Sequence, residues 1–139
     1  MGIPLFPPRF DTDLLKPFYE GLEKGELRMS ACSECGTFHW YPPEIMPCHP
    51  DARMDWLPIS PEGTIYSFTT VTRSLLPGNH RDEVPFTVIL VESDDVPNAR
   101  IPSLFIATDG REPECGMRVH LAPVKAGDHI LPAFEPLDK

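Results

Sequence analysis

The chain has 139 residues, the size of one domain or of one domain with a small appendage. Its formal net charge of −9 argues against a general nucleic-acid binder, because the phosphate backbone is held mainly by clustered Lys and Arg. No apolar run approaches the roughly 18 residues that span a bilayer, and the N-terminus lacks the pattern of a signal peptide. We therefore expect a cytoplasmic protein that does not enter a membrane.

Frequent proline and glycine restrict the chain to short elements. Eighteen prolines and nine glycines exclude long helices over most of its length. Residues 1 to 10 are proline-rich and apolar, and predict an extended arm. A short helix follows, beginning either near Thr12 or at Pro17 and ending near Gly25. Its apolar positions fall on one stripe: Leu14, Leu15, Phe18, Tyr19 and Leu22.

A short strand is predicted at residues 27 to 31, and no steady period follows until about residue 58. From Gly63 onward the pattern is that of β-strands, at 64–74, 85–92, 101–109, 117–124 and 130–134. Clusters of proline, glycine, asparagine and aspartate supply the turns between them, at 77–79, 94–98, 109–110 and 126–128. Five such strands suit a small closed barrel.

A cluster of cysteines lies in the aperiodic segment. Cys32 and Cys35 form a CxxC motif followed by Gly36, and Cys48 comes twelve residues later. A CxxC turn directs two thiolates to one point, as in a zinc knuckle. Tetrahedral zinc needs a fourth ligand, and a second knuckle places Asp51 there. Asp51 fits the spacing, whereas His49 or His39 fits the chemistry of zinc; we rank Asp51 first and keep both histidines open.

The cysteine cluster has other interpretations. A thioredoxin-like redox site needs a βαβ context, which is missing. A metal-free ribbon held together by packing of Trp40, Tyr41 and Trp56 remains an alternative. A closed structural zinc site is favoured over a catalytic one, because no HExxH or similar motif supplies a general base.

The order of motifs along the chain resembles a known family. The matching segments are Phe18 to Leu22, the CxxC motif with Gly36, Tyr41 to Pro43, Pro47-Cys48, Gly63 to Thr69, Val84 to Phe86, Gly116 to Val119, and Leu131 to Pro136. Together they are similar to the bacterial and archaeal domain of unknown function thirty-five family. This family combines a rubredoxin-like zinc ribbon with an OB-fold. The resemblance therefore implies a mainly β chain with an arm and helix at 1–30, a zinc ribbon at 31–58 and a five-stranded OB-fold barrel at 59–139.

The resemblance also implies a function. Members of the family accompany thiolase-fold enzymes, including thiolases, acyltransferases and aldolases that act on acyl-CoA. The partner carries the catalytic Cys and His, and the small subunit packs on it and helps to form the acyl-CoA channel. We therefore expect a non-catalytic accessory subunit in a hetero-oligomer, with a structural zinc and a CoA thioester shared with the partner. Asp51 stands where zinc-binding members of the family have a fourth cysteine, which bears on zinc occupancy and not on the fold.

Positive charge gathers in one loop, and one cysteine stands apart from the ribbon. Arg73, His80 and Arg81 lie between the first two predicted barrel strands, and Arg binds phosphate through charge-assisted hydrogen bonds. The loop is either a solvated basic segment or a contact for the phosphates of CoA. Cys115 is interpreted as a loop thiol, since no adjacent group lowers its pKa reliably.

Two other functions remain open. OB-folds also bind single-stranded nucleic acid, although the negative charge argues against this. A free-standing acyl-CoA-binding or hydrolysing protein is the third hypothesis. In the leading hypothesis the interface anchors are aromatic, as is common for Trp and Tyr. The candidates are Phe6, Phe10, Trp40, Tyr41 and Trp56.

Overall fold

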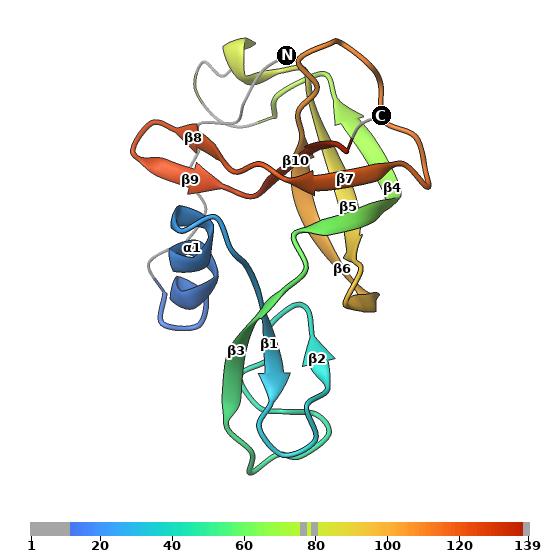
Figure 1. The fold of residues 1–139 in the computed structure, drawn as a ribbon. Helices are drawn as coiled ribbons and strands as arrows, with labels where there is room; N and C mark the ends of the chain where they lie inside the picture. The colour runs from blue at the N-terminus through green and yellow to red at the C-terminus, as the bar shows by residue number, and fades with distance from the viewer. Residues whose placement is uncertain (1–11, 76–77, 79–80, 138–139) are drawn as a thin grey trace.

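The structure is a computed structural model that describes residues 12–75, 78 and 81–137. In these residues a short helix packs beside a three-stranded sheet, and the chain then forms a closed five-stranded barrel with a small hairpin beside it (Figure 1). The predicted fold class is confirmed: mainly β, with an N-terminal helix and a five-stranded OB-like barrel. Within the described part of the chain, no helix has the length and apolar character needed to cross a bilayer. The predicted arm at residues 1 to 10 lies outside the described residues.

Helix α1 spans Lys16–Glu23 and has Pro17 in its first turn, where the missing N–H costs no helical hydrogen bond. It ends because Gly25 adopts a left-handed conformation, with φ of 77°. The Gly25 N–H donates to the Leu22 carbonyl at 3.0 Å, and the Glu26 N–H donates to the Gly21 carbonyl at 2.8 Å. This is a Schellman cap, which turns the chain directly into the first strand.

The ribbon sheet has the strand order β2-β1-β3, with β1 at Leu27–Cys32, β2 at Phe38–His39 and β3 at Met54–Ile59. Strands β1 and β3 pair antiparallel over their whole lengths, from Leu27 opposite Ile59 to Cys32 opposite Met54. The segment between Cys32 and Met54 is therefore a long loop whose two ends are held side by side by the paired strands. The strand predicted at residues 27 to 31 is therefore observed as β1, which ends one residue later.

The barrel contains β4 (Glu62–Val71), β5 (Phe86–Ser93), β6 (Val96–Phe105), β7 (Arg118–Leu121) and β10 (Ala133–Pro136), in the order β10-β6-β5-β4-β7. Strand β10 closes it by pairing parallel with β6 and antiparallel with β7. A short 3₁₀ turn, η1 at Arg81–Glu83, precedes β5. The first four predicted strands correspond to β4, β5, β6 and β7 with shifted ends, whereas the fifth, at 130–134, covers the end of a short strand at His129–Leu131 and the start of β10.

A second hairpin, which the sequence did not predict, lies beside the barrel. Strands β8 (Val124–Ala126) and β9 (His129–Leu131) pair antiparallel around Gly127, whose φ is 65°. The predicted turn at residues 126 to 128 is the tip of this hairpin. The hairpin packs on the barrel through a small second core formed by Leu104, Ala126, Leu131 and Ala133.

One continuous core joins the helix, the ribbon sheet and the barrel. Its members are Phe18, Leu22, Leu27, Met29, Ile59, Ile65, Ile89, Val91, Val96, Ala99, Ile101, Phe105, Val119 and Phe134. Phe18 lies at the junction, with its ring centroid 4.9 Å from that of Trp40 and 6.4 Å from that of Trp56. These two tryptophans, which we considered as partner anchors, therefore seal the helix against the ribbon. Tyr41 remains largely exposed, at 59%.

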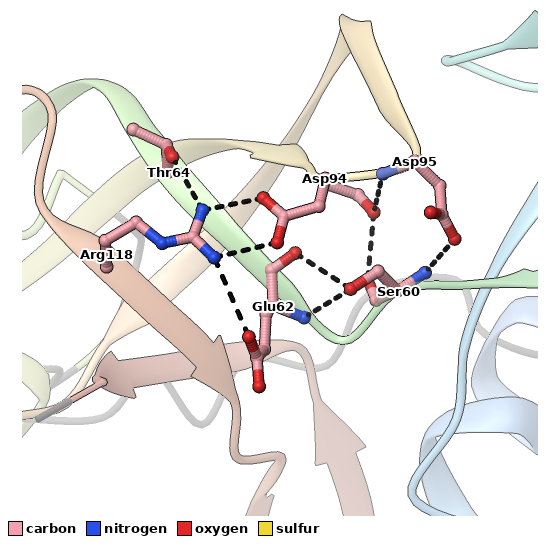
Figure 2. A network of polar contacts seen from close by, with 7 residues as sticks. Ser60, Glu62, Thr64, Asp94, Asp95 and Arg118 are labelled. Carbon is pink, nitrogen blue, oxygen red and sulfur yellow. Dashed lines mark hydrogen bonds and ion pairs between the residues drawn. The ribbon is translucent and has the colours of Figure 1, made fainter.

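A polar network fixes the point where the ribbon enters the barrel (Figure 2). Ser60 lies between β3 and β4, and its N–H donates to the Asp95 carboxylate at 2.8 Å. The Ser93 hydroxyl donates to the Ser60 carbonyl at 2.9 Å. Because Ser93 and Asp95 flank the turn between β5 and β6, these bonds hold the ribbon–barrel connection against that turn.

Candidate metal centre

The first two cysteines lie on a knuckle at the end of β1. Cys32 is the last residue of the strand, and its N–H donates to the Thr37 carbonyl at 2.9 Å. The Gly36 N–H donates to the Cys32 carbonyl at 2.8 Å, and the Glu34 N–H donates to Cys32 Sγ at 3.4 Å. Gly36 has φ of 74°, a conformation that glycine adopts without strain. The turn therefore brings the Cys35 thiol back beside Cys32.

The loop between β2 and β3 completes the cluster with Cys48 and His49. The ligand atoms of Cys32, Cys35, Cys48 and His49 all lie within 4.8 Å of one another. Cys35 Sγ is 3.5 Å from Cys48 Sγ, and Cys32 Sγ is 3.7 Å from His49 Nδ1. Tetrahedral zinc with ordinary bond lengths holds two sulfurs about 3.8 Å apart and a sulfur and a nitrogen about 3.6 Å apart. The four residues therefore lie close enough to hold a metal ion, and their spacing fits structural zinc.

The structure brings together three of the four predicted ligands and places His49 beside them instead of Asp51. Asp51 is exposed and is not part of the group. The chain makes a turn after Cys48 that is closed by the Ala52 N–H and the His49 carbonyl at 2.8 Å, so no second knuckle forms. His39 Nε2 lies 3.7 Å from Cys48 Sγ, but His39 is also outside the four-residue group. The sequence feature that pointed to His49 was its chemistry, because an imidazole directly follows the thiolate ligand Cys48.

The surroundings of Cys35 and Cys48 shift the pKa values of their thiols in opposite directions. The Thr37 hydroxyl, 3.1 Å from Cys35 Sγ, and the Thr37 N–H lower the pKa of Cys35 to about 6 by stabilising its thiolate. Desolvation, followed by the hydrogen bond with Cys35, raises the pKa of Cys48 to about 11. A metal ligand must be deprotonated, so binding displaces the Cys48 proton at neutral pH.

The predicted CoA contacts lie at one end of the barrel, away from the cysteines. Arg73 and Arg81 are exposed on the segment that joins β4 to β5, and His80 lies outside the described residues. A cavity of about 380 Å³ opens where the segment leaves the barrel. Its lining includes Thr70, Thr87 and Arg111. The cavity was not predicted, because residues 107–113, which complete it, show no periodic pattern.

Comparison with known proteins agrees with this architecture. Residues 56–123 match the model of the C-terminal OB-fold domain of ChsH2. The resemblance found in the sequence is thereby confirmed. The matched segment runs from within β3 through β7 and excludes the three cysteines of the metal centre. No curated protein matches the chain.

Two solved structures extend the likeness over nearly the whole chain. One, the Ltp2–ChsH2(DUF35) aldolase, has a TM-score of 0.77 and 23% identity, covering 94% of this chain and 98% of the other. The second is a DUF35-family protein of unknown function from Sulfolobus solfataricus. Its TM-score is 0.62 and its identity 11%, with 93% of this chain and 89% of the other covered. At these identities the two structures establish a shared fold of helix, ribbon and barrel.

Proposed function

We propose that this chain is the accessory subunit of a thiolase-fold acyl-CoA enzyme, in a hetero-oligomer whose other subunit carries the catalytic Cys and His. The main support is the likeness of the whole chain, ribbon and barrel together, to one in an aldolase described as an Ltp2–ChsH2(DUF35) assembly. The motif order of the sequence supports the same assignment, because the family it resembles accompanies thiolase-fold enzymes. The acyl group and the reaction of the partner are left open by this proposal.

The titratable groups of the barrel also support a non-catalytic role. Outside the metal centre, clearly shifted pKa values include those of Tyr19, raised by burial, and of Asp94, Asp109 and Arg118. The last three form exposed ion pairs, an arrangement typical of a structural surface. Perturbed pKa values in a catalytic site come instead from burial and charge partners within a cleft. The catalytic groups are therefore assigned to the partner.

Zinc is proposed as a structural element at Cys32, Cys35, Cys48 and His49. Three thiolates and an imidazole fill a tetrahedral shell, so no open position is left for a substrate or a reactive water. The metal would instead order residues 33–53, which contain little regular structure. Because unfolded chain does not preform the site, the free energy of metal binding would stabilise the folded ribbon.

The alternative of nucleic-acid binding finds little support on the barrel surface. OB-folds bind oligonucleotides on the face of their second and third strands, here β5 and β6. Ile89 and Ile101 are fully buried, so the alternating residues face outward. On this face Val88, Leu90 and Pro102 are aliphatic or proline, and Leu104 is covered by the β8–β9 hairpin. Arg100, on the same face, is paired with Glu92 at 3.0 Å and lies over the Tyr66 ring, so it offers little free positive charge or aromatic surface to a nucleic acid.

We further propose that Arg73, His80 and Arg81 contact the phosphates of the CoA thioester that is shared with the partner. Two of the three side chains are exposed on a loop held by the barrel, a common placement for functional contacts. Arg111 lies in the wall of the adjacent cavity, where its guanidinium is paired with Asp109 at 2.7 Å. The CoA assignment is separate from that of the accessory subunit, so either can fail alone.

The test is to purify the complex from source cells by a tag on this chain, and to assay acyl-CoA turnover by each component and by both together. We expect a thiolase-fold protein to copurify and to need this chain for full activity. Full activity of the partner alone would overturn the proposed function. A fluorescence anisotropy titration with single-stranded oligonucleotides at about 150 mM salt addresses the alternative. We expect no binding, and salt-sensitive binding would favour the nucleic-acid function.

A further inference from the structure

The three cysteines of the metal centre differ in their access to solvent. Cys32 is buried, at 2% exposure, and its Sγ accepts a backbone hydrogen bond and lies beside the His49 ring. Cys35 and Cys48 are exposed, and their sulfurs are 3.5 Å apart. A solvent-borne oxidant therefore reaches two of the three sulfurs, and these two are already neighbours.

From this geometry we propose that Cys35 and Cys48 are an oxidation site, at which a hydroperoxide forms a disulfide between them and so expels the metal. The inference rests on the proposed zinc site. A disulfide holds its sulfurs at about 2.05 Å, so these two sulfurs must approach by about 1.5 Å. Zinc holds two sulfur ligands about 3.8 Å apart, so the disulfide and the bound metal exclude each other.

The chemistry needs only a hydroperoxide as oxidant. One thiolate attacks an oxygen of the hydroperoxide, so that an S–O bond forms, the O–O bond breaks and a sulfenic acid results; the released alkoxide or hydroxide takes a proton from water. The second thiolate attacks that sulfur, forms the S–S bond and displaces hydroxide. The two sulfurs together lose two electrons, which the hydroperoxide gains.

His49 determines what remains after oxidation. Because an imidazole replaces a fourth sulfur, the disulfide leaves only Cys32 and His49 as donors, fewer than the four of a structural zinc site. Cys32 then has no second thiol in the cluster with which to pair. The oxidised ribbon is therefore expected to contain one disulfide, one thiol and no zinc, and to recover its metal when reductant and zinc are supplied.

The test uses the purified full chain, in which zinc is counted by elemental analysis before oxidation. Hydrogen peroxide is then added, and zinc release is followed with a chromogenic chelator. A glutamate-specific protease cuts after Glu34 and Glu44, which separates the three ribbon cysteines into different peptides. Mass spectrometry of the unreduced digest then identifies the linked pair. Cys115→Ser is the matched control, because it removes the thiol that lies outside the cluster.

We expect release of about one zinc per chain with a Cys35–Cys48 linkage, in the wild type and in Cys115→Ser alike. Retention of zinc with unmodified thiols, at peroxide concentrations that oxidise free cysteine, would overturn the proposal. A linkage that includes Cys32 would also overturn it. If the protein contains no zinc before oxidation, the proposed metal site fails, and a Cys35–Cys48 linkage in the same sample still supports the oxidisable pair. Partner assembly is measured separately and depends on neither result.

Discussion

The guanidinium of Arg118 donates two hydrogen bonds to the carboxylate of Asp94, from Nη1 at 2.6 Å and from Nη2 at 2.7 Å (Figure 2). The pair connects β7 to the turn between β5 and β6. Arg118 also lies 3.6 Å from the Glu62 carboxylate and donates to the Thr64 hydroxyl at 3.1 Å, which adds the start of β4. One arginine thus joins three parts of the barrel near its junction with the ribbon.

Replacing Asp94 with Asn is expected to lower the free energy of unfolding at pH 7 by roughly 0.5–1 kcal/mol. The figure is modest because both side chains are about two-fifths exposed and solvent screens the pair. The hydrogen bond with Arg118 lowers the pKa of Asp94 in the folded state. The stabilisation is therefore present above the unfolded pKa, near 3.9, and is lost as the pH falls through the lower folded pKa.

Denaturant unfolding of the wild type and Asp94→Asn between pH 7 and pH 3 measures this dependence. The difference between the two proteins should shrink below about pH 4. Glu44→Gln is the control, because Glu44 is exposed and makes no ion pair among the described residues. A difference that is constant across the pH range would contradict the assignment to the Arg118 pair.

Removal of single metal ligands should identify the fourth one. We expect about one zinc per chain in the wild type and in Asp51→Asn, and a large loss of zinc in His49→Ala, because the shell then lacks a ligand. Elemental analysis after gel filtration measures the content. His39→Ala is the matched histidine control, since His39 approaches only Cys48 closely. Retention of zinc in His49→Ala together with its loss in Asp51→Asn would instead identify Asp51 as the fourth ligand, as a second knuckle requires.

Replacement of Phe18 with Ala should destabilise the whole chain, because its buried ring packs on Trp40 and Trp56 at the junction of helix and ribbon. Truncation of a buried Phe costs about 3–5 kcal/mol. Tyr41→Ala removes an exposed ring next to the same cluster and should change the free energy of unfolding by less than about 0.5 kcal/mol. Similar losses in both variants would mean that the helix does not depend on this contact.

The CoA proposal predicts a kinetic effect in the assembled complex. Arg73→Ala or Arg81→Ala should raise the apparent acyl-CoA KM about tenfold to hundredfold, the equivalent of losing one charge-assisted contact of roughly 1.5–3 kcal/mol. Assembly with the partner should survive, as a pull-down would show. Arg53→Ala is the control, because this exposed arginine lies on the ribbon and pairs with Asp55. Unchanged KM values in both loop variants would remove the proposed contact.

Barrel strands could be predicted where they bury alternate residues. Strand β5 shows this most clearly, since Thr87, Ile89, Val91 and Ser93 are buried and the residues between them are not. The β8–β9 hairpin was missed because three-residue strands are too short to show a period. Strand β6 begins at Val96, before the predicted 101; the early part was missed because Pro97 and Asn98, both exposed in the strand, are residue types that predict a turn.

The metal cluster could be predicted only in part. The positions of Cys32, Cys35 and Gly36 define a local turn, and a local turn depends on neighbouring residues alone. The fourth ligand depends on how the chain folds after Cys48, where a hydrogen bond between residues 49 and 52 determines which side chain faces the thiols. Spacing favoured Asp51, whereas the backbone of this turn brings His49 to the sulfurs.

The pairing of β1 with β3 has a consequence for evolution and engineering of the ribbon. Six consecutive residue pairs hold the two strands together, so the loop of residues 33–53 begins and ends at one fixed place. Closing a loop of this kind costs chain entropy that grows only slowly with its length. Residues 33–53 can therefore be lengthened, shortened or exchanged for another metal-binding or recognition loop without a change of register in the barrel. Residues 33–53 thus form a replaceable loop on a β-sheet base that does not change.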